Sequence, residues 1–248
     1  MAKKTLSWRW GVFAVALFIL FVLLQLPASW LIAKFYKNNT LLQNVSGNIW
    51  VGQADWQYRQ FHGSVSWNTR PLDLFWLRLG ANVEVRTGNS LLAGQVGYGL
   101  GKRLILKDVK GQLAPDTLQQ MVNWQWPSNA LQHDIEQLRY QSETGFSQTN
   151  GQLNWTGGLL QYNVRMRDEK MNVPSLKATL SDEAGKLKLD VRDTKDQKMA
   201  NFSLDQQLML DSQLTQRLLL NVPTYSGQAS LDSAVISLRQ PLMNMGSN

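Results

Sequence analysis

The pattern of apolar and polar positions changes type near residue 37. From Gly11 to Leu24 the chain runs for fourteen residues without a charged or strongly polar side chain, and up to Ile32 only Gln25 and Ser29 interrupt the apolar run. A helix that crosses a membrane needs about 20 apolar residues, and tryptophans favour its two interfaces. We therefore predict a single transmembrane anchor over residues 11–33, after a cytoplasmic start at residues 1–10. The residues assigned to the anchor are Trp8, Trp10, Phe13, Leu17, Phe21, Leu24 and Trp30.

The charges around this segment indicate its orientation. Lys3, Lys4 and Arg9 precede it, whereas Lys34 and Lys37 follow it. Because positive charges are retained on the cytoplasmic side, this modest excess predicts a cytoplasmic N-terminus and an exported remainder.

A cleaved signal peptide is the alternative, with residues 11–24 as its apolar core. A cut after Ala28 would place Leu26 at the third position back, where a small residue is preferred. The pattern therefore favours an anchor that is not cleaved.

Beyond Lys37 the chain has the features of β-strands separated by turns. Val83 to Arg86 alternates between apolar and charged residues, which is typical of a strand with one buried and one wet face. The predicted strands are residues 45–56, 62–67, 74–87, 91–98, 104–113, 135–141, 149–155, 159–166, 176–180, 187–191, 202–210, 218–222 and 229–238. One short helix is predicted over residues 116–122, where a proline and an acidic residue begin an apolar pattern.

The predicted fold class is therefore mainly β. After the anchor, residues 38–248 are expected to form an extended, curved antiparallel β-sheet or sandwich-like domain with one short helix. The aromatic content falls after Trp155, so a subdivision near residues 157–165 is an alternative.

Glycines carry three local predictions. Val45–Trp56 is interpreted as the first strand of the domain, in which Gly47 and Gly52 allow bends and Trp50 packs. Gly157 and Gly158 are predicted to turn a hairpin between residues 149–155 and 159–166. The segment 181–185, which ends in a glycine, is predicted to turn another between residues 176–180 and 187–191.

The candidate chemistry is sparse. The chain has no cysteine, which excludes thiol catalysis and disulfides. His133, Asp134 and Glu136 could bind a cation weakly or act as acid and base, but a polar loop before a strand is the favoured interpretation. His62 and Ser64 lack the Gly-x-Ser-x-Gly elbow of a nucleophile. No glycine-rich segment ends in the Gly-Lys-Ser/Thr of a phosphate loop. We therefore predict no enzymatic activity, no catalytic or metal-binding residues and no cofactor.

The net charge of +7 changes this picture little. Five of the 25 basic residues and none of the 18 acidic residues lie in positions 1–37, which leaves 20 basic and 18 acidic residues beyond them. A nearly neutral remainder gives no electrostatic footprint for nucleic acid.

Most of the ten tryptophans are interpreted as strand residues that pack in a β core. Trp124 and Trp126 differ, because they lie beside Pro127 in a predicted loop. These two are predicted to be exposed and to contact a partner.

Three motifs in order carry a family resemblance. They are Val45-Ser-Gly-x-x-Trp50-x-Gly52-x-Ala54, Asp108-Val-x-Gly111-x-Leu113 before a short helix with Leu118, and Gly151-x-Leu153-x-Trp155-x-x-Gly158. Behind a single anchor, this series resembles the type II secretion system protein N (GspN) family of bacteria. The motif residues interpreted as mainly structural are Gly47, Trp50, Gly52, Gly111, Gly151 and Trp155.

The resemblance implies an accessory component of the type II protein secretion machinery. Such a protein would be held in the bacterial inner membrane by one span, with its bulk in the periplasm, and would take part in export of folded proteins across the outer membrane. It implies no catalytic residues. The expected mechanism is scaffolding, in which edge strands and exposed aromatics contact the inner-membrane platform or the secretin channel.

A lipid-binding protein is the competing prediction. Anchored periplasmic proteins that resemble the AsmA group present an apolar β-groove to lipid or another hydrophobic ligand. A concave apolar face continuous with the anchor would favour this alternative, whereas a filled core with an aromatic rim would favour a protein partner.

Overall fold

The computed structural model describes residues 8–35, 41–71, 73, 78–99, 101–121, 125–164 and 167–242. Its helices are α1 (Trp8–Gln25), α2 (Ala28–Phe35), α3 (Pro115–Met121) and α4 (Gln216–Leu219). Its strands are β1 (Leu42–Gly47), β2 (Val51–Tyr58), β3 (Phe61–Thr69), β4 (Arg78–Thr87), β5 (Ser90–Gly99), β6 (Arg103–Leu113), β7 (Leu131–Gln141), β8 (Gly145–Trp155), β9 (Gly158–Val164), β10 (Arg167–Val173), β11 (Leu176–Glu183), β12 (Lys186–Asp193), β13 (Lys198–Leu204), β14 (Met209–Thr215) and β15 (Ala234–Pro241).

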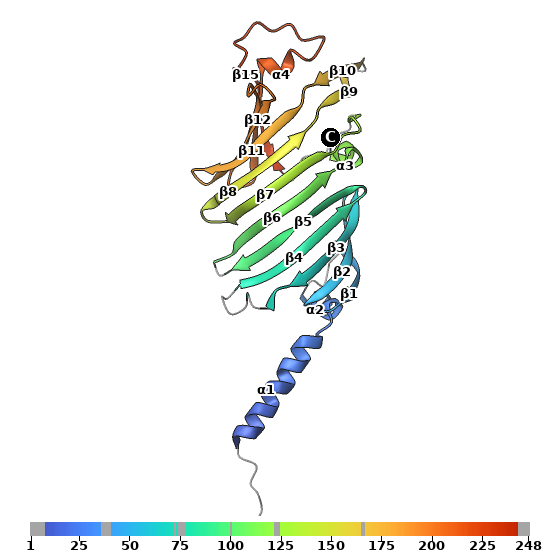
Figure 1. The fold of residues 1–248 in the computed structure, drawn as a ribbon, viewed down its shortest axis with the longest axis vertical. Helices are drawn as coiled ribbons and strands as arrows, with labels where there is room; N and C mark the ends of the chain where they lie inside the picture. Colours follow the sequence, from blue (N-terminus) through green and yellow to red (C-terminus); the bar gives the residue numbers. More distant parts are fainter. Residues whose placement is uncertain are drawn as a thin grey trace, which may run out of the picture.

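One antiparallel sheet contains thirteen of these strands, in the order β1-β2-β3-β4-β5-β6-β7-β8-β11-β12-β13-β14-β15. Each strand pairs with the next along the chain except at β9 and β10, which form a separate hairpin between β8 and β11 (Figure 1). The predicted mainly β fold with a large antiparallel sheet is confirmed. The sheet also runs unbroken past residues 157–165, because β8 pairs directly with β11.

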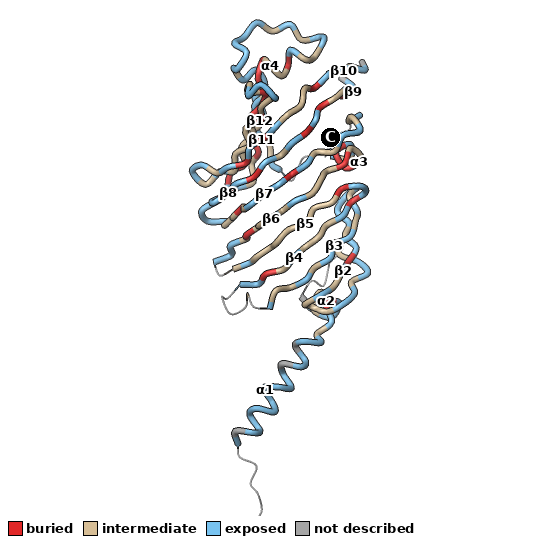
Figure 2. Tube along the Cα trace, viewed as in Figure 1, coloured by how far each residue is buried: buried red, intermediate tan, exposed pale blue. Residues whose placement is uncertain are grey.

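The core lies where the sheet curls in its C-terminal half. Leu138 in β7 and Leu204 in β13 belong to one buried cluster, although β8, β11 and β12 separate their strands in the sheet. Strands β12 and β15 accordingly turn out of the plane of β4–β8 in Figure 1. Figure 2 shows the resulting contrast between buried positions in the upper strands and mainly half-buried or exposed positions in β1–β6. The other buried members of the cluster are Phe146, Leu180 and Leu210.

The N-terminal segment forms two helices separated at Leu26 and Pro27. Proline has no N–H to continue the helix, and the carbonyl of Leu26 instead accepts a hydrogen bond from the N–H of Ile49 at 3.1 Å. The predicted anchor over residues 11–33 is therefore divided between α1 and α2. Among the helices of the described residues, none combines the length and the apolarity that a membrane span requires.

The segment 45–56 is a hairpin, so its prediction as one strand was wrong. Gly47 ends β1 with φ of 86°, a conformation that favours glycine. The Asn48 side-chain oxygen then accepts hydrogen bonds from the N–H groups of Trp50 at 2.9 Å and Val51 at 2.8 Å. By accepting these two hydrogen bonds, the Asn48 side chain stabilises the turn in which the chain reverses.

The predicted hairpin at Gly157 and Gly158 was also wrong. These residues have φ of 73° and 133°, but they direct the chain out of the main sheet. A Cβ on Gly157 would collide with the carbonyl groups of Val173 and Pro174, where the chain returns. The two glycines correctly indicated a change of chain direction. The strands that β8 and β9 pair with, however, are β11 and β10, which lie further along the chain.

Two C-terminal strand predictions were wrong because side chains cap the backbone locally. Residues 202–210 contain the turn between β13 and β14, where the Asp205 carboxylate accepts hydrogen bonds from the N–H groups of Gln207 and Met209 at 2.9 and 3.0 Å. Residues 218–222 overlap α4, which Thr215 caps by accepting a hydrogen bond from the N–H of Leu218.

Two other local predictions are confirmed. The helix predicted over residues 116–122 corresponds to α3, and Val122 lies outside the described residues. The buried Ser90 hydroxyl donates to the Thr117 hydroxyl at 2.6 Å and accepts from the N–H of Ala114 at 2.7 Å, which holds the start of α3 against β5. The hairpin predicted at residues 181–185 joins β11 to β12.

Candidate functional site

A row of polar residues crosses one face of the whole sheet. Strand register places one residue of each of the thirteen strands in this row, and only one of them is apolar. The polar row consists of Ser46, Gln53, Ser66, Glu84, Ala93, Lys110, Asp134, Gln152, Thr179, Asp190, Asn201, Gln213 and Ser237. Because side chains alternate between faces, the row defines the polar face of the sheet.

The neighbouring row lies on the opposite, apolar face. It consists of Ala54, Val65, Val85, Leu92, Gly111, His133, Leu153, Ala178, Val191, Ala200, Leu214 and Ile236, from β2 to β15. His133 is its one polar side chain. Alternation along each strand from β2 to β15 thus gives the sheet two chemically different faces.

His133 is therefore a buried imidazole among apolar neighbours. Its side chain is 8% exposed, and its Nε2 atom has no hydrogen-bond partner among the described residues. Burial lowers the pKa of His133, and the negative charge of Asp134 opposes this shift. Asp134 itself lies in the polar row and forms an ion pair with Lys110 at 3.1 Å. The two side chains are thus on opposite faces, and the described residues contain no group of three His, Asp or Glu side chains suited to a metal.

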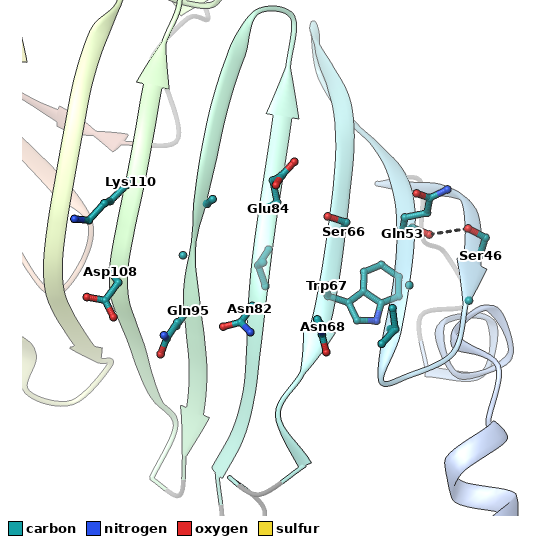
Figure 3. A pocket seen from close by; sticks show the side chains of 16 residues that line it. Ser46, Gln53, Ser66, Trp67, Asn68, Asn82, Glu84, Gln95, Asp108 and Lys110 are labelled. Atoms are coloured by element: carbon teal, nitrogen blue, oxygen red, sulfur yellow. Dashed lines mark hydrogen bonds between the residues drawn. The ribbon is translucent and has the colours of Figure 1, made fainter.

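The polar face is hollowed over β1–β6 into a depression of about 880 Å³ (Figure 3). Side-chain amides line much of it, from Gln53 in β2 to Gln95 in β5. Three charged residues line it, and two of them are in ion pairs, Glu84 with Arg86 at 2.5 Å and Lys110 with Asp134 at 3.1 Å; the third is Asp108. Such a surface can form hydrogen bonds in both directions with a polypeptide or another polar ligand.

A second depression of about 930 Å³ lies on the same face near the other ends of β6–β12. Its lining includes Gln112, Gln132, Asn154, Lys177 and Arg192 in successive register positions. Both depressions are therefore lined mainly by polar-face residues.

Of the two tryptophans predicted to contact a partner, the structure describes one. Trp126 is half-buried and packs edge-to-face on Trp155, with ring centroids 5.8 Å apart. Trp124 lies outside the described residues. The partner role of both stays a prediction.

Four of the motif residues lie in closely packed surroundings. Gly52 lies beneath the indole of Trp67, and a Cβ there would overlap the ring. Gly111 has φ of 154°, and a Cβ there would collide with the carbonyl of Leu91. A Cβ on Gly151 would approach the backbone of Ile135 to 3.0 Å. Trp155 is 8% exposed, and its indole N–H donates to the carbonyl of Asn129 at 3.2 Å.

The two edges of the sheet differ in protection. At one edge, β1 is six residues long, contains a bulge between Gln43 and Ser46, and lies beside α2. Asn44 in this bulge has φ of 50° and donates to Asp55 at 2.7 Å. Bulged, short strands are a common means of blunting an edge.

The opposite edge, β15, is longer, and its register with β14 also shifts, between Leu214 and Thr215. It is eight residues long and exposes apolar side chains, with Val235 at 40% and Leu238 at 53% exposure. Its one charged side chain, Arg239, is engaged by Asp205 at 2.9 Å. No described strand pairs with its outer edge. The sequence indicated a strand at residues 229–238 but not its edge position, because an edge depends on which strand is last in the sheet.

A comparison with family models matches residues 38–247, nearly all of the sheet-forming chain, to "Type II secretion system (T2SS), protein N". The chain belongs to the type II secretion system protein N family. This confirms the resemblance noted from the motifs. Neither the curated proteins nor the solved structures contain a match. The family membership thus identifies the secretion machinery, while the surfaces that act in it must be inferred from the chain itself.

Proposed function

We propose that the protein is an accessory scaffold of the type II secretion machinery, held in the bacterial inner membrane with its sheet in the periplasm. Membership of the protein N family supports the assignment to the machinery. The observation that supports scaffolding is the outer edge of β15, which pairs with no described strand and offers backbone N–H and C=O groups beside exposed apolar side chains. An extended segment of another component would add a strand there, as in β-augmentation.

The N-terminal segment supports the membrane part of this proposal. Phe13, Leu17 and Phe21 on α1 are 55–59% exposed. Exposure of such side chains to water is unfavourable, because burial of apolar surface is stabilising. A lipid environment around the segment 11–33 would account for them.

A non-enzymatic role agrees with the polar face. The charged side chains of its N-terminal depression are engaged in ion pairs or dispersed among amides. This arrangement suits binding of a polypeptide rather than proton transfer. The lipid-groove alternative has no specific support, because the hollows lie on the polar face and the core cluster fills the curled part of the apolar face.

Photocrosslinking in cells tests the proposal. A photoreactive amino acid is placed at Val235 or Leu238 of the full chain and, as matched controls, at Leu79 or Leu159, which are 59% and 47% exposed away from this edge. We expect adducts at the β15 positions that mass spectrometry identifies as another type II secretion component, with none at the controls. Adducts only with unrelated proteins, or equal adducts at all four positions, would contradict the edge-docking mechanism.

A further inference from the structure

A small cavity near the start of β4 gathers basic side chains. It has a volume of about 210 Å³ and lies on the polar face. Its lining consists of Arg70, Asp73, Arg78, Gln95, Gly97, Ile105 and Lys107. Ile105 is only 7% exposed and provides an apolar floor in an otherwise polar surface. The cavity is therefore partly shielded from water.

Arg70 is held in a fixed position at this cavity. Its guanidinium forms an ion pair with Asp73 at 2.7 Å and donates to the side-chain oxygen of Gln95 at 2.7 Å. Gly80 lies directly beneath the pair, and a Cβ there would collide with the Asp73 carboxylate. The Nε atom of Arg70 is buried without a hydrogen-bond partner among the described residues. A buried charged donor without an acceptor is costly, so an additional acceptor would satisfy it.

The other two cations of the cavity are not neutralised. Neither Arg78 nor Lys107 has an acidic partner within 4.0 Å among the described residues, in contrast to Lys110, Arg86 and Arg192 on the same face. Three cations and the single carboxylate of Asp73 leave a net charge of +2 around the cavity. Such an excess of cations in a shielded hollow favours an anion.

We propose that this cavity binds a phosphate group, with Arg78 and Lys107 as its charged ligands and Arg70 as a fixed donor behind them. A phosphate presents several oxygens, so it can accept from a guanidinium fork and an ammonium at once. The site is independent of the secretion role proposed above.

The cavity's position defines two sources for the phosphate. The start of β4 and the end of β5 lie at the same end of the molecule as α1 (Figure 1). A phospholipid headgroup would reach the site from a membrane around α1, whereas free phosphate would reach it from solution.

Titration calorimetry of the full chain in non-ionic detergent tests the site. The ligands are inorganic phosphate, short-chain phosphatidylglycerol and, as a zwitterionic comparison, short-chain phosphatidylcholine. We expect saturable binding of phosphate or phosphatidylglycerol, weakened about tenfold or more in Arg78→Gln/Lys107→Gln, since two charge-assisted contacts are removed. The matched control, Lys170→Gln/Lys186→Gln, removes two exposed lysines outside the cavity and should bind as the native chain does.

The outcomes are distinguishable. Tighter binding of phosphatidylglycerol than of phosphate assigns the site to headgroups, and the reverse assigns it to free phosphate. Recovery of binding in Arg78→Lys/Lys107→Arg would show that the charges carry it. Equal losses in both glutamine variants, non-saturating heats, or no binding of either ligand would overturn the proposal.

Discussion

The hydroxyl of Tyr140 donates a hydrogen bond of 3.0 Å to the main-chain carbonyl of Gln206, 66 residues further along the chain. Tyr140 lies near the end of β7, whereas Gln206 lies in the turn between β13 and β14. This bond closes the curl of the sheet at one end of the core cluster. The ring of Tyr140 also packs on Phe146, with centroids 4.9 Å apart.

Replacing Tyr140 by Phe should therefore loosen the curl. We expect a loss of about 0.5–1.5 kcal/mol in the free energy of unfolding, the usual net value of one hydrogen bond. Denaturant unfolding of the full chain, followed by tryptophan fluorescence, measures it. Tyr98→Phe is the control, because Tyr98 is 49% exposed and its hydroxyl has no partner among the described residues. Equal effects of the two substitutions would argue against the closing role of Tyr140.

The core cluster predicts a larger effect at Leu180. This side chain is 7% exposed and belongs to the cluster that brings Leu138 of β7 and Leu204 of β13 together. Leu180→Ala should cost about 2–5 kcal/mol because it removes buried methyl groups and leaves a cavity. Leu79→Ala, at 59% exposure, should change stability by less than about 0.5 kcal/mol. Similar unfolding midpoints for both variants would show that the curled half is not the core.

Gly111 should tolerate no side chain. Its φ of 154° and the nearby carbonyl of Leu91 both oppose a Cβ, so Gly111→Ala should destabilise the protein by about 2 kcal/mol or more. Gly99→Ala is the matched control, since the nearest atom to its Cβ would be 3.7 Å away. Thermal unfolding of the two variants decides this point, and an unchanged midpoint for Gly111→Ala would refute it.

His133 should make stability depend on pH. Because burial lowers its folded pKa below the ordinary value of 6.5, the unfolded chain takes up this proton first as the pH falls. The stability associated with neutral His133 is thus present above about pH 6.5 and is lost progressively below it. His133→Leu should remove this part of the acid destabilisation. Unfolding curves at pH 5 and pH 8 measure it, and an identical pH dependence in the variant would be contrary to the account.

The order of apolar, polar and turn-forming residues in the sequence predicted much of the fold. Alternation such as that at Val83–Arg86 identified the strands and their two faces, and the proline and acidic residue at the start of α3 identified the helix. Turns were predicted where glycine conformation and partner choice coincide, as at Gly185.

Failures occurred where a distant segment or a local side chain determined the outcome. Gly157 has the expected conformation, but β8 pairs with β11 because β9 and β10 pair with each other. Asn48 reverses the chain within a stretch rich in strand-forming residues. The cavity at Arg70 and the free edge at β15 depend on tertiary placement, so no spacing of residues in the sequence could indicate them.

The central claim is tested most directly by blocking the edge of β15 with charged residues and measuring which secretion components are purified together with the protein. Val235→Lys/Leu238→Lys places two charges on β15, which oppose addition of a strand. The full chain is purified from cells with its crosslinked or bound partners, beside Leu79→Lys/Leu159→Lys as the exposed-site control. The account predicts that the β15 variant loses the other type II secretion components while the control retains them. Undiminished recovery with a folded β15 variant would contradict it.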